Sequence, residues 1–134
     1  MPTYTFKKGE KLKSRSTIQQ MFTKGKSFAN YPLRLVWIEQ EKEGNYPVQF
    51  SLSVAKKKFP KAAHRNRLRR RIREAWRLNK HLLYERIDEQ NKQYAFMIIY
   101  GAKEELSYQE IEAAMKTIIF RFLKKVRANQ NKSS

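Results

Sequence analysis

The amino-acid sequence predicts an α+β sandwich in which helices pack on a small sheet. Residues 48–54 alternate apolar and polar side chains, the period of a strand with one buried face. Residues 95–100 (AFMIIY) form a continuous apolar run, which is typical of a strand covered on both faces. From residue 111 to residue 126, apolar side chains recur at steps of three and four, the period of an amphipathic helix.

The length and composition indicate one domain. A chain of 134 residues, 40% of them hydrophobic, is long enough for a modest core and too short for two comfortable ones. We therefore expect a single domain over residues 1–134, with frayed ends at about 1–8 and 127–134, where little can be buried.

The first helix is expected to begin at Ser16-Thr17-Ile18-Gln19, which has the pattern of a capping box. Gly25 is placed to end it, because glycine adopts the left-handed conformation of a helix terminus at little cost. The apolar side chains expected on one side of this helix are Ile18, Met21 and Phe22.

Two antiparallel strands are expected next, at residues 33–38 and 48–54, joined by a charged segment with a turn signal at Gly44-Asn45. A basic helix follows Pro60 and runs to about residue 85. The strand at residues 95–100 belongs inside the sheet. The last helix starts at the capping box Ser107-Tyr108-Gln109-Glu110.

The basic helix contains the segment HRNRLRRRIREAWR, residues 64–77, which is dominated by arginine and has Glu74 as its only acid. At about 100° per residue, its apolar side chains fall in one arc and most of its polar ones roughly opposite. The apolar arc is Leu68, Ile72, Ala75 and Trp76, and the opposite face is Asn66, Arg69, Arg70, Arg73 and Arg77. Arg67 and Arg71 lie on a flank with Glu74, and Arg65 near the apolar edge. The helix is thus expected to be anchored by one side and to present guanidinium groups outward.

The charge of the chain indicates a polyanionic partner. There are 30 lysines and arginines against 12 acids, a formal net charge of +18. A solvated surface is the alternative for any charged run, but like charges at i,i+4, such as Arg65 and Arg69, destabilise a helix. Binding to the phosphates of a nucleic acid is the simplest explanation for a helix that carries so many repelling charges. Membrane binding is not expected, because the basic segments lack a broad apolar face.

The loop before the basic helix extends the positive charge with Lys56, Lys57, Lys58 and Lys61. Asn66 is either a plain surface residue or a contact to a base edge, a ribose hydroxyl or a metal-bound water. His64 is read as a phosphate or structural contact in preference to a general base.

The sequence offers little for chemistry of its own. The absence of cysteine excludes disulfides, thiolate metal sites and cysteine nucleophiles, and it suits a reducing cytosol. Two histidines are too few for a metal cluster, and no serine lies in a nucleophile-elbow pattern. We expect neither a metal site nor catalytic residues in the chain, no secretory signal or membrane span, and a cytoplasmic location.

The segment from Arg65 to Arg77 closely resembles the motif of the bacterial ribonuclease P protein component. The resemblance covers most of the chain. LKSRSTIQQMFTKGKSF is similar to the family's first helix, SLSVAKKK to its strand before the lysine loop, and ELSYQEIE to the start of its last helix.

The resemblance implies an α-β-β-β-α-β-α sandwich with a small mixed sheet and a left-handed βαβ crossover, a rare exception to the handedness rule. It implies a subunit of the ribonucleoprotein that removes the 5′ leader of precursor tRNA. The partners would be the catalytic RNA and precursor tRNA, with no obligate protein partner. Magnesium ions, held mainly by the RNA, would supply the catalysis, which the protein does not perform alone.

Residue by residue, Arg65, Asn66, Arg67, Arg69, Arg70 and Arg73 match the family's motif, and Lys56 and Lys57 match its paired lysines. The family's leader cleft, between the first helix and the sheet, corresponds to Phe22, Ile18 and Val36. Phe22 would stack on an unpaired base, with core packing as the alternative role. Ile18 and Val36 stand where the family often has aromatic residues. The segment KKKFPKAAH is one residue longer than the common form and lacks its glycine.

Two other functions remain open from the sequence. A ribosomal or other structural RNA-binding protein would have the same composition. A free-standing nuclease would need a cluster of carboxylates or histidines, which the sequence lacks.

Overall fold

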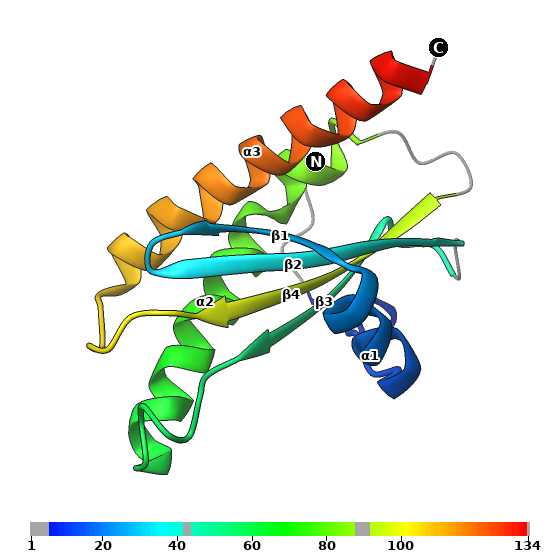
Figure 1. Cartoon of the computed structure of the whole chain (residues 1–134). Coiled ribbons are helices and arrows are strands. Elements are labelled where there is room, and N and C mark those ends of the chain that lie inside the picture. The colour runs from blue at the N-terminus through cyan, green and yellow to red at the C-terminus, as the bar shows by residue number, and fades with distance from the viewer. Residues whose placement is uncertain (1–5, 42–43, 88–91, 134) are drawn as a thin grey trace.

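A mixed four-stranded sheet with helices on both faces forms the body of the structure, a computed structural model that describes residues 6–41, 44–87 and 92–133, with side chains up to residue 127. Within these residues the strands are β1 (Lys26–Asn30), β2 (Leu33–Glu41), β3 (Val48–Ser53) and β4 (Lys92–Tyr100). The helices are α1 (Arg15–Lys24), α2 (Ala62–Tyr84) and α3 (Tyr108–Ser133), preceded by a 3-10 turn, η1 (Lys8–Glu10). The expected α-β-β-β-α-β-α order is confirmed (Figure 1).

The strand order is β1-β2-β4-β3, so β4 lies inside the sheet as its apolar run predicts. β1 and β4 both pair antiparallel with β2, and β3 pairs parallel with β4, Phe50 lying opposite Phe96. β2 and β3 therefore run antiparallel, as expected, but β4 separates them. The chain leaves β3 through α2 and returns as β4, and this long connection inserts β4 between two strands that are consecutive in sequence.

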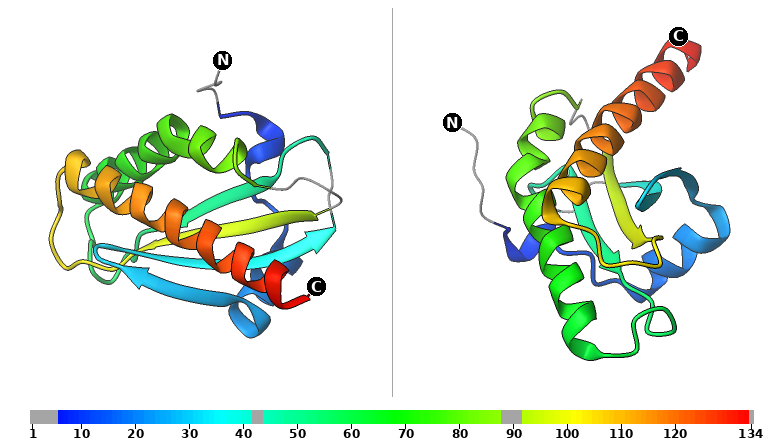
Figure 2. Two further views of the ribbon diagram at one scale, coloured as in Figure 1. Left: turned by 90° about the horizontal axis from the view of Figure 1, so that it is seen from above. Right: turned by 90° about the vertical axis from the view of Figure 1, so that its left-hand side faces the viewer.

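The β3-α2-β4 connection is the left-handed crossover that the resemblance implies. β3 and β4 are parallel neighbours, and α2 lies on the same face of the sheet as α3 (Figures 1 and 2). Right-handed connections are the rule for parallel strands joined in this way. The reversed hand puts α2 against α3 on one face and leaves the edge of β3 next to α2.

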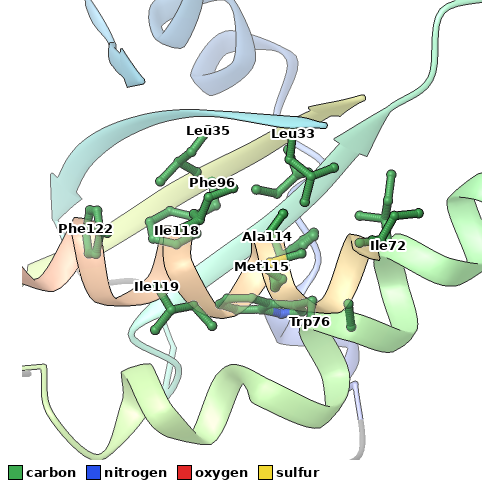
Figure 3. Close-up of a cluster of buried hydrophobic side chains, with 14 of the residues drawn as sticks. Leu33, Leu35, Ile72, Trp76, Phe96, Ala114, Met115, Ile118, Ile119 and Phe122 are labelled. Carbon is green, nitrogen blue, oxygen red and sulfur yellow. The ribbon is translucent and has the colours of Figure 1, made fainter. Parts of the chain in front are cut away.

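The main core lies between the sheet and the pair α2 and α3. β2 and β4 turn Leu35 and Phe96 toward this layer, α2 contributes Ile72 and Trp76, and α3 contributes Phe122 (Figure 3). All five are at most 1% exposed. Their burial supplies most of the hydrophobic free energy that holds the two long helices to the sheet.

A smaller cluster covers the opposite face, where α1 packs (Figure 2). Met21 of α1 lies there with Val36 of β2 and with Ala95 and Met97 of β4. Because both faces are covered, β4 has apolar side chains on each, which explains its unbroken apolar run.

The ends of α1 differ from the prediction. The cap is Ser14, whose hydroxyl accepts a hydrogen bond from the backbone of Thr17 (3.2 Å), so the helix begins before the predicted box at Ser16. Gly25 does end the helix, but its φ of −71° is not left-handed. Glycine is required there because a Cβ would lie 2.2 Å from the carbonyl oxygen of Met21. Steric exclusion is therefore the reason for this glycine.

The box at the start of α3 is confirmed: the Ser107 hydroxyl accepts from the backbone of Glu110 (3.2 Å), and the Glu110 carboxylate accepts from that of Ser107 (3.1 Å). Gly44 has a φ of 78°, as its turn signal predicts, while residues 42–43 of that loop lie outside the described residues. α3 continues to Ser133, past the expected end near residue 126. The single-domain organisation and the fraying of the ends stay predictions, and residues 1–5 and 134 lie outside the described part.

Candidate nucleic-acid interface

The apolar side of α2 fixes the orientation of the helix. Leu68, Ile72, Ala75 and Trp76 are each 0% exposed, as the sequence predicts. The indole of Trp76 lies between Phe50 of β3 and Phe96 of β4, with ring centroids 4.8 and 5.8 Å away. A helix held by such a stripe cannot roll without opening the core, so its arginine face stays turned to solvent.

The arginines of α2 divide into two groups by their partners. Arg67 and Arg71 form ion pairs with Glu105, and Arg77 pairs with Glu74. Among the described residues, no carboxylate lies within ion-pair distance of Arg69, Arg70 or Arg73. Arg70 and Arg73 are exposed, and Arg69 is half-buried. These three arginines therefore form the centre of the outward guanidinium face, beside the paired Arg77.

Glu105, in the loop between β4 and α3, organises the first turns of α2. Its carboxylate accepts from Arg67 Nε at 2.7 Å and lies 2.9 Å from His64 Nδ1 and 3.4 Å from Arg71. The hydrogen bond from Arg67, reinforced by that from His64, lowers the pKa of Glu105 to about 2. This contact could not be predicted from the sequence, because Glu105 lies 38 residues after Arg67. His64 makes a structural contact, one of the two roles expected of it.

The loop is held in place by Tyr100. The Tyr100 hydroxyl donates to the carbonyl of Glu104 (2.6 Å) and accepts from the backbone of Leu106 (3.0 Å). Glu105 lies between these two anchored positions. The carboxylate is therefore a preformed partner for α2, which makes Arg67 and Arg71 structural contacts as well as surface cations.

Arg65 closes the lysine loop. Its guanidinium donates to the carbonyls of Phe59 and Pro60, both at 2.8 Å, from the position near the apolar edge that the sequence predicts. Phe59 is buried against Tyr100 with ring centroids 5.7 Å apart. The loop between these contacts leaves its lysines exposed: Lys56, Lys57, Lys58 and Lys61. These amines lie beside the start of α2, so they extend the positive surface as expected.

Asn66 is exposed next to this loop. Its side-chain oxygen lies 3.5 Å from Arg69 Nη1, a long contact that orients the amide toward the arginine face. The amide thus keeps donor and acceptor capacity on the surface where Arg69, Arg70 and Arg73 lie.

The three residues expected in the leader cleft lie in different environments. Phe22 is 61% exposed, so the alternative of core packing is wrong for it; Met21 fills the space under α1. Ile18 is half-buried, and Val36 is 7% exposed and covered by α1. Contact with a leader stays a prediction for all three, and Phe22 offers the largest free surface.

A cavity that the sequence does not indicate borders the arginine face of α2. The cavity, of about 590 Å³, lies between Arg69 and Arg73, the edge of β3 and the segment before α1. Lys11 and Lys13 belong to its lining. The lysine-rich run at residues 7–13 was the available signal, but nothing local shows that it folds against the basic helix.

No group of three or more histidine, aspartate or glutamate side chains that could hold a metal ion occurs in the described part of the chain. The helices of the described chain also include none long and apolar enough to cross a bilayer.

Comparison with known proteins decides the family. A family model described as Ribonuclease P matches residues 6–123. The chain belongs to the ribonuclease P protein family. The ribonuclease P protein component of Porphyromonas gingivalis is 39% identical over 123 residues, covering 90% of this chain and 88% of the relative. That of Clostridioides difficile is 34% identical over 119 residues, covering 87% and 94%.

Solved structures agree with the ribonuclease P fold. The RNase P protein from Thermotoga maritima aligns with a TM-score of 0.65 at 23% identity, over 84% of this chain and 96% of that one. The RNase P protein of Staphylococcus aureus aligns with a TM-score of 0.63 at 20% identity, over 86% and 95%. The family resemblance read from the arginine motif is confirmed, and with it the expected role as the protein component of an endoribonuclease with an RNA partner.

Proposed function

We propose that this chain binds the catalytic RNA of ribonuclease P through the outward face of α2 and holds the 5′ leader of precursor tRNA near Phe22. The observation that carries the proposal is the arrangement of Arg69, Arg70 and Arg73. They project from a helix whose other side is fully buried, and the described residues give them no carboxylate. Guanidinium groups fixed in this way can each grip a phosphate with two hydrogen bonds.

The physical role of such a surface is to bring two polyanions together. Catalytic RNA and precursor tRNA repel each other, and the cations of α2 and the lysine loop lower this repulsion and release counterions on binding. In the proposal, magnesium ions held mainly by the RNA supply the cleavage chemistry. The protein contributes affinity and position, and it acts in the cytoplasm.

Exposed Phe22 supports the leader part of the proposal. An unpaired base stacked on an aromatic ring gains about 1–3 kcal/mol, whatever its identity. A single-stranded leader of variable sequence is recognised best by such a contact. Ile18 borders the ring on α1 and adds an apolar surface of lower specificity.

A precursor-tRNA cleavage assay at low magnesium tests the function. Added to its cognate catalytic RNA, the chain should accelerate leader removal, and Arg70→Ala should weaken this stimulation more than Lys116→Ala, which removes an exposed cation from α3. No stimulation would favour the alternative of a structural RNA-binding protein. Cleavage by the protein alone would indicate a nuclease and contradict the proposal.

A further inference from the structure

The cavity beside α2 has a lining with two chemical halves. Its cationic half is formed by Arg69 and Arg73 of α2 and by Lys11 and Lys13 of the segment before α1. Its apolar half includes Phe6 and Leu52. Its volume of about 590 Å³ lies within the usual range of small-ligand sites.

The wall opposite α2 is fixed by backbone and buried contacts. The amide of Leu12 donates to the carbonyl of Phe50 at 2.9 Å, and Lys11 forms an isolated parallel bridge with Phe50 at the edge of β3. Glu10, the preceding residue, is fully buried and paired with Lys80 of α2. The segment carrying Lys11 and Lys13 is therefore fastened to both β3 and α2, and the cavity does not depend on a free tail.

The positive charge of the cationic half is not balanced by neighbouring carboxylates. The cavity lining contains no acidic side chain, and the neighbouring carboxylate of Glu10 is turned inward and engaged with Lys80. Arg69 and Arg73 lie one turn apart on the same side of α2, a spacing that lets two guanidinium groups face one phosphate. Lys11 and Lys13 are exposed and face them across the cavity.

The apolar half offers a ring. Phe6 is half-buried and packs edge-on against Phe50, with centroids 6.0 Å apart and an interplanar angle of 77°. Lys11 Nζ lies 5.8 Å from the centroid of the Phe6 ring. A ligand that combines a flat ring with a phosphate can therefore meet an aromatic surface and a cation together. A phosphate of a rigid duplex would leave the apolar half unused.

We propose that this cavity binds one unpaired nucleotide of an RNA, with its phosphate between Arg69, Arg73 and Lys13 and its base against Phe6. The inference rests on the proposed function for its RNA partner, and it adds a second single-strand site apart from Phe22. Arg69 and Arg73 belong both to the cavity and to the outward face of α2. An RNA bound along α2 thus reaches the cavity without a break.

A fluorescent reporter at the ring tests the site directly. The native Trp37 and Trp76 are 6% and 0% exposed, so Phe6→Trp adds a separate accessible indole to the full chain. Hexauridylate should quench its emission, whereas an abasic hexanucleotide of equal charge and inorganic phosphate should not. Equal quenching by the abasic strand, or none by hexauridylate, would overturn the proposal.

Affinity measurements separate this site from the leader contact. Phe6→Leu keeps an apolar side chain but removes the ring, and it should weaken hexauridylate binding at fixed salt about tenfold, the loss expected for one stacked base. Lys13→Gln should reduce the salt slope by about 0.7, the value for one phosphate contact of a single strand. Lys116→Gln is the matched control for charge, and Phe120→Leu, on the 45% exposed ring of α3, is the control for an exposed ring, while Phe22→Leu reports on the leader contact.

The outcomes distinguish the two proposals. Hexauridylate binding that responds to Phe22→Leu but not to Phe6→Leu and Lys13→Gln would overturn the cavity site and leave the proposed function standing. Retained sensitivity to Phe6→Leu without stimulation of precursor cleavage would support the cavity and overturn the proposed function. Thermal unfolding of each variant shows whether a loss of affinity reflects a loss of fold. The quenching of Phe6→Trp by hexauridylate tests the site without relying on the affinities of the other variants.

Discussion

Lys80 Nζ lies 2.6 Å from Glu10 Oε2, and the two side chains are 3% and 0% exposed. The carboxylate of Glu10 also accepts from the hydroxyl of Tyr84 (2.6 Å) and from the backbone of Lys7 (2.9 Å). This buried ion pair joins the segment before α1 to the second half of α2. It places that segment beside the arginine helix, where Lys11 and Lys13 extend the positive surface.

Replacing Lys80 with methionine should destabilise the protein. Lys80→Met leaves the buried carboxylate of Glu10 without its cation, and such a loss costs about 3–5 kcal/mol. Urea unfolding measures it. Lys92→Met, which breaks the exposed pair of Lys92 with Glu39 (3.1 Å), should cost less than about 1 kcal/mol. Adding Glu10→Leu to Lys80→Met should restore part of the lost stability. Equal losses of stability for Lys80→Met and Lys92→Met would contradict the role of the buried pair.

Glu105 should make the stability depend on acid pH. Its pKa is about 2 in the folded chain against an ordinary value of 4.5, because Arg67, His64 and Arg71 face its carboxylate. A depressed pKa contributes stability above pH 4.5 that is lost as the pH falls toward 2. Glu105→Gln should remove this contribution. Glu104→Gln, at the exposed neighbouring position, is the control. A carboxyl titration by NMR with a midpoint near 4.5 would contradict the contacts.

Truncation of Met21 and truncation of Phe22 should affect different properties: the first should lower the stability of the fold, and the second should weaken RNA binding. Met21 is 1% exposed under α1, so Met21→Ala should lower the free energy of unfolding by about 2–5 kcal/mol. Phe22 is 61% exposed, and Phe22→Ala should change it by less than about 0.5 kcal/mol while weakening the binding of precursor tRNA that carries a leader. Binding of mature tRNA is the internal control. Strong destabilisation by Phe22→Ala would restore the core-packing role.

Gly25 should not tolerate alanine. The added Cβ would lie 2.2 Å from the carbonyl oxygen of Met21 and 3.0 Å from that of Trp37, so the end of α1 or β2 must move, at a cost of about 1–3 kcal/mol. Gly101→Ala is the control, since its Cβ would meet the carbonyl of Pro32 at an ordinary 3.5 Å. Thermal unfolding compares the two, and an unchanged midpoint for Gly25→Ala would show that the contact relaxes freely.

The sequence predicts those parts of the fold that depend on local periodicity. The stripe of Leu68, Ile72 and Trp76 requires a helix with one buried side, and the unbroken run of β4 requires a strand inside the sheet. Both follow from the spacing of apolar residues alone. The prediction from sequence fails where two neighbouring residues fit the same local role equally well. Ser14 and Ser16 can each cap α1, and Met21 and Phe22 can each point into the core. Tertiary packing makes these choices.

Long-range partners could not be predicted from the sequence. Nothing near β2 or β3 shows that β4 enters between them, because this depends on the return of the chain through α2. The same holds for the site. Arg67 and Arg71 look like free cations until the loop after β4 brings Glu105 to them, and Lys11 reaches the cavity beside Arg69 through the pairing of Glu10 with Lys80.

The salt dependence of binding to the catalytic RNA tests the central claim, that the fixed arginines of α2 contact phosphates. The logarithm of affinity should fall steeply with the logarithm of salt concentration, and Arg69→Ala with Arg73→Ala should reduce the slope by at least about one, the value for the phosphate that the two guanidinium groups face, without unfolding the protein. Arg70→Ala, which lies outside the cavity, should reduce it by about one, and Lys116→Ala with Lys124→Ala, on the exposed side of α3, should reduce it less than the arginine pair. A slope near zero for the native chain, or an unchanged slope for the double arginine variant, would contradict the account.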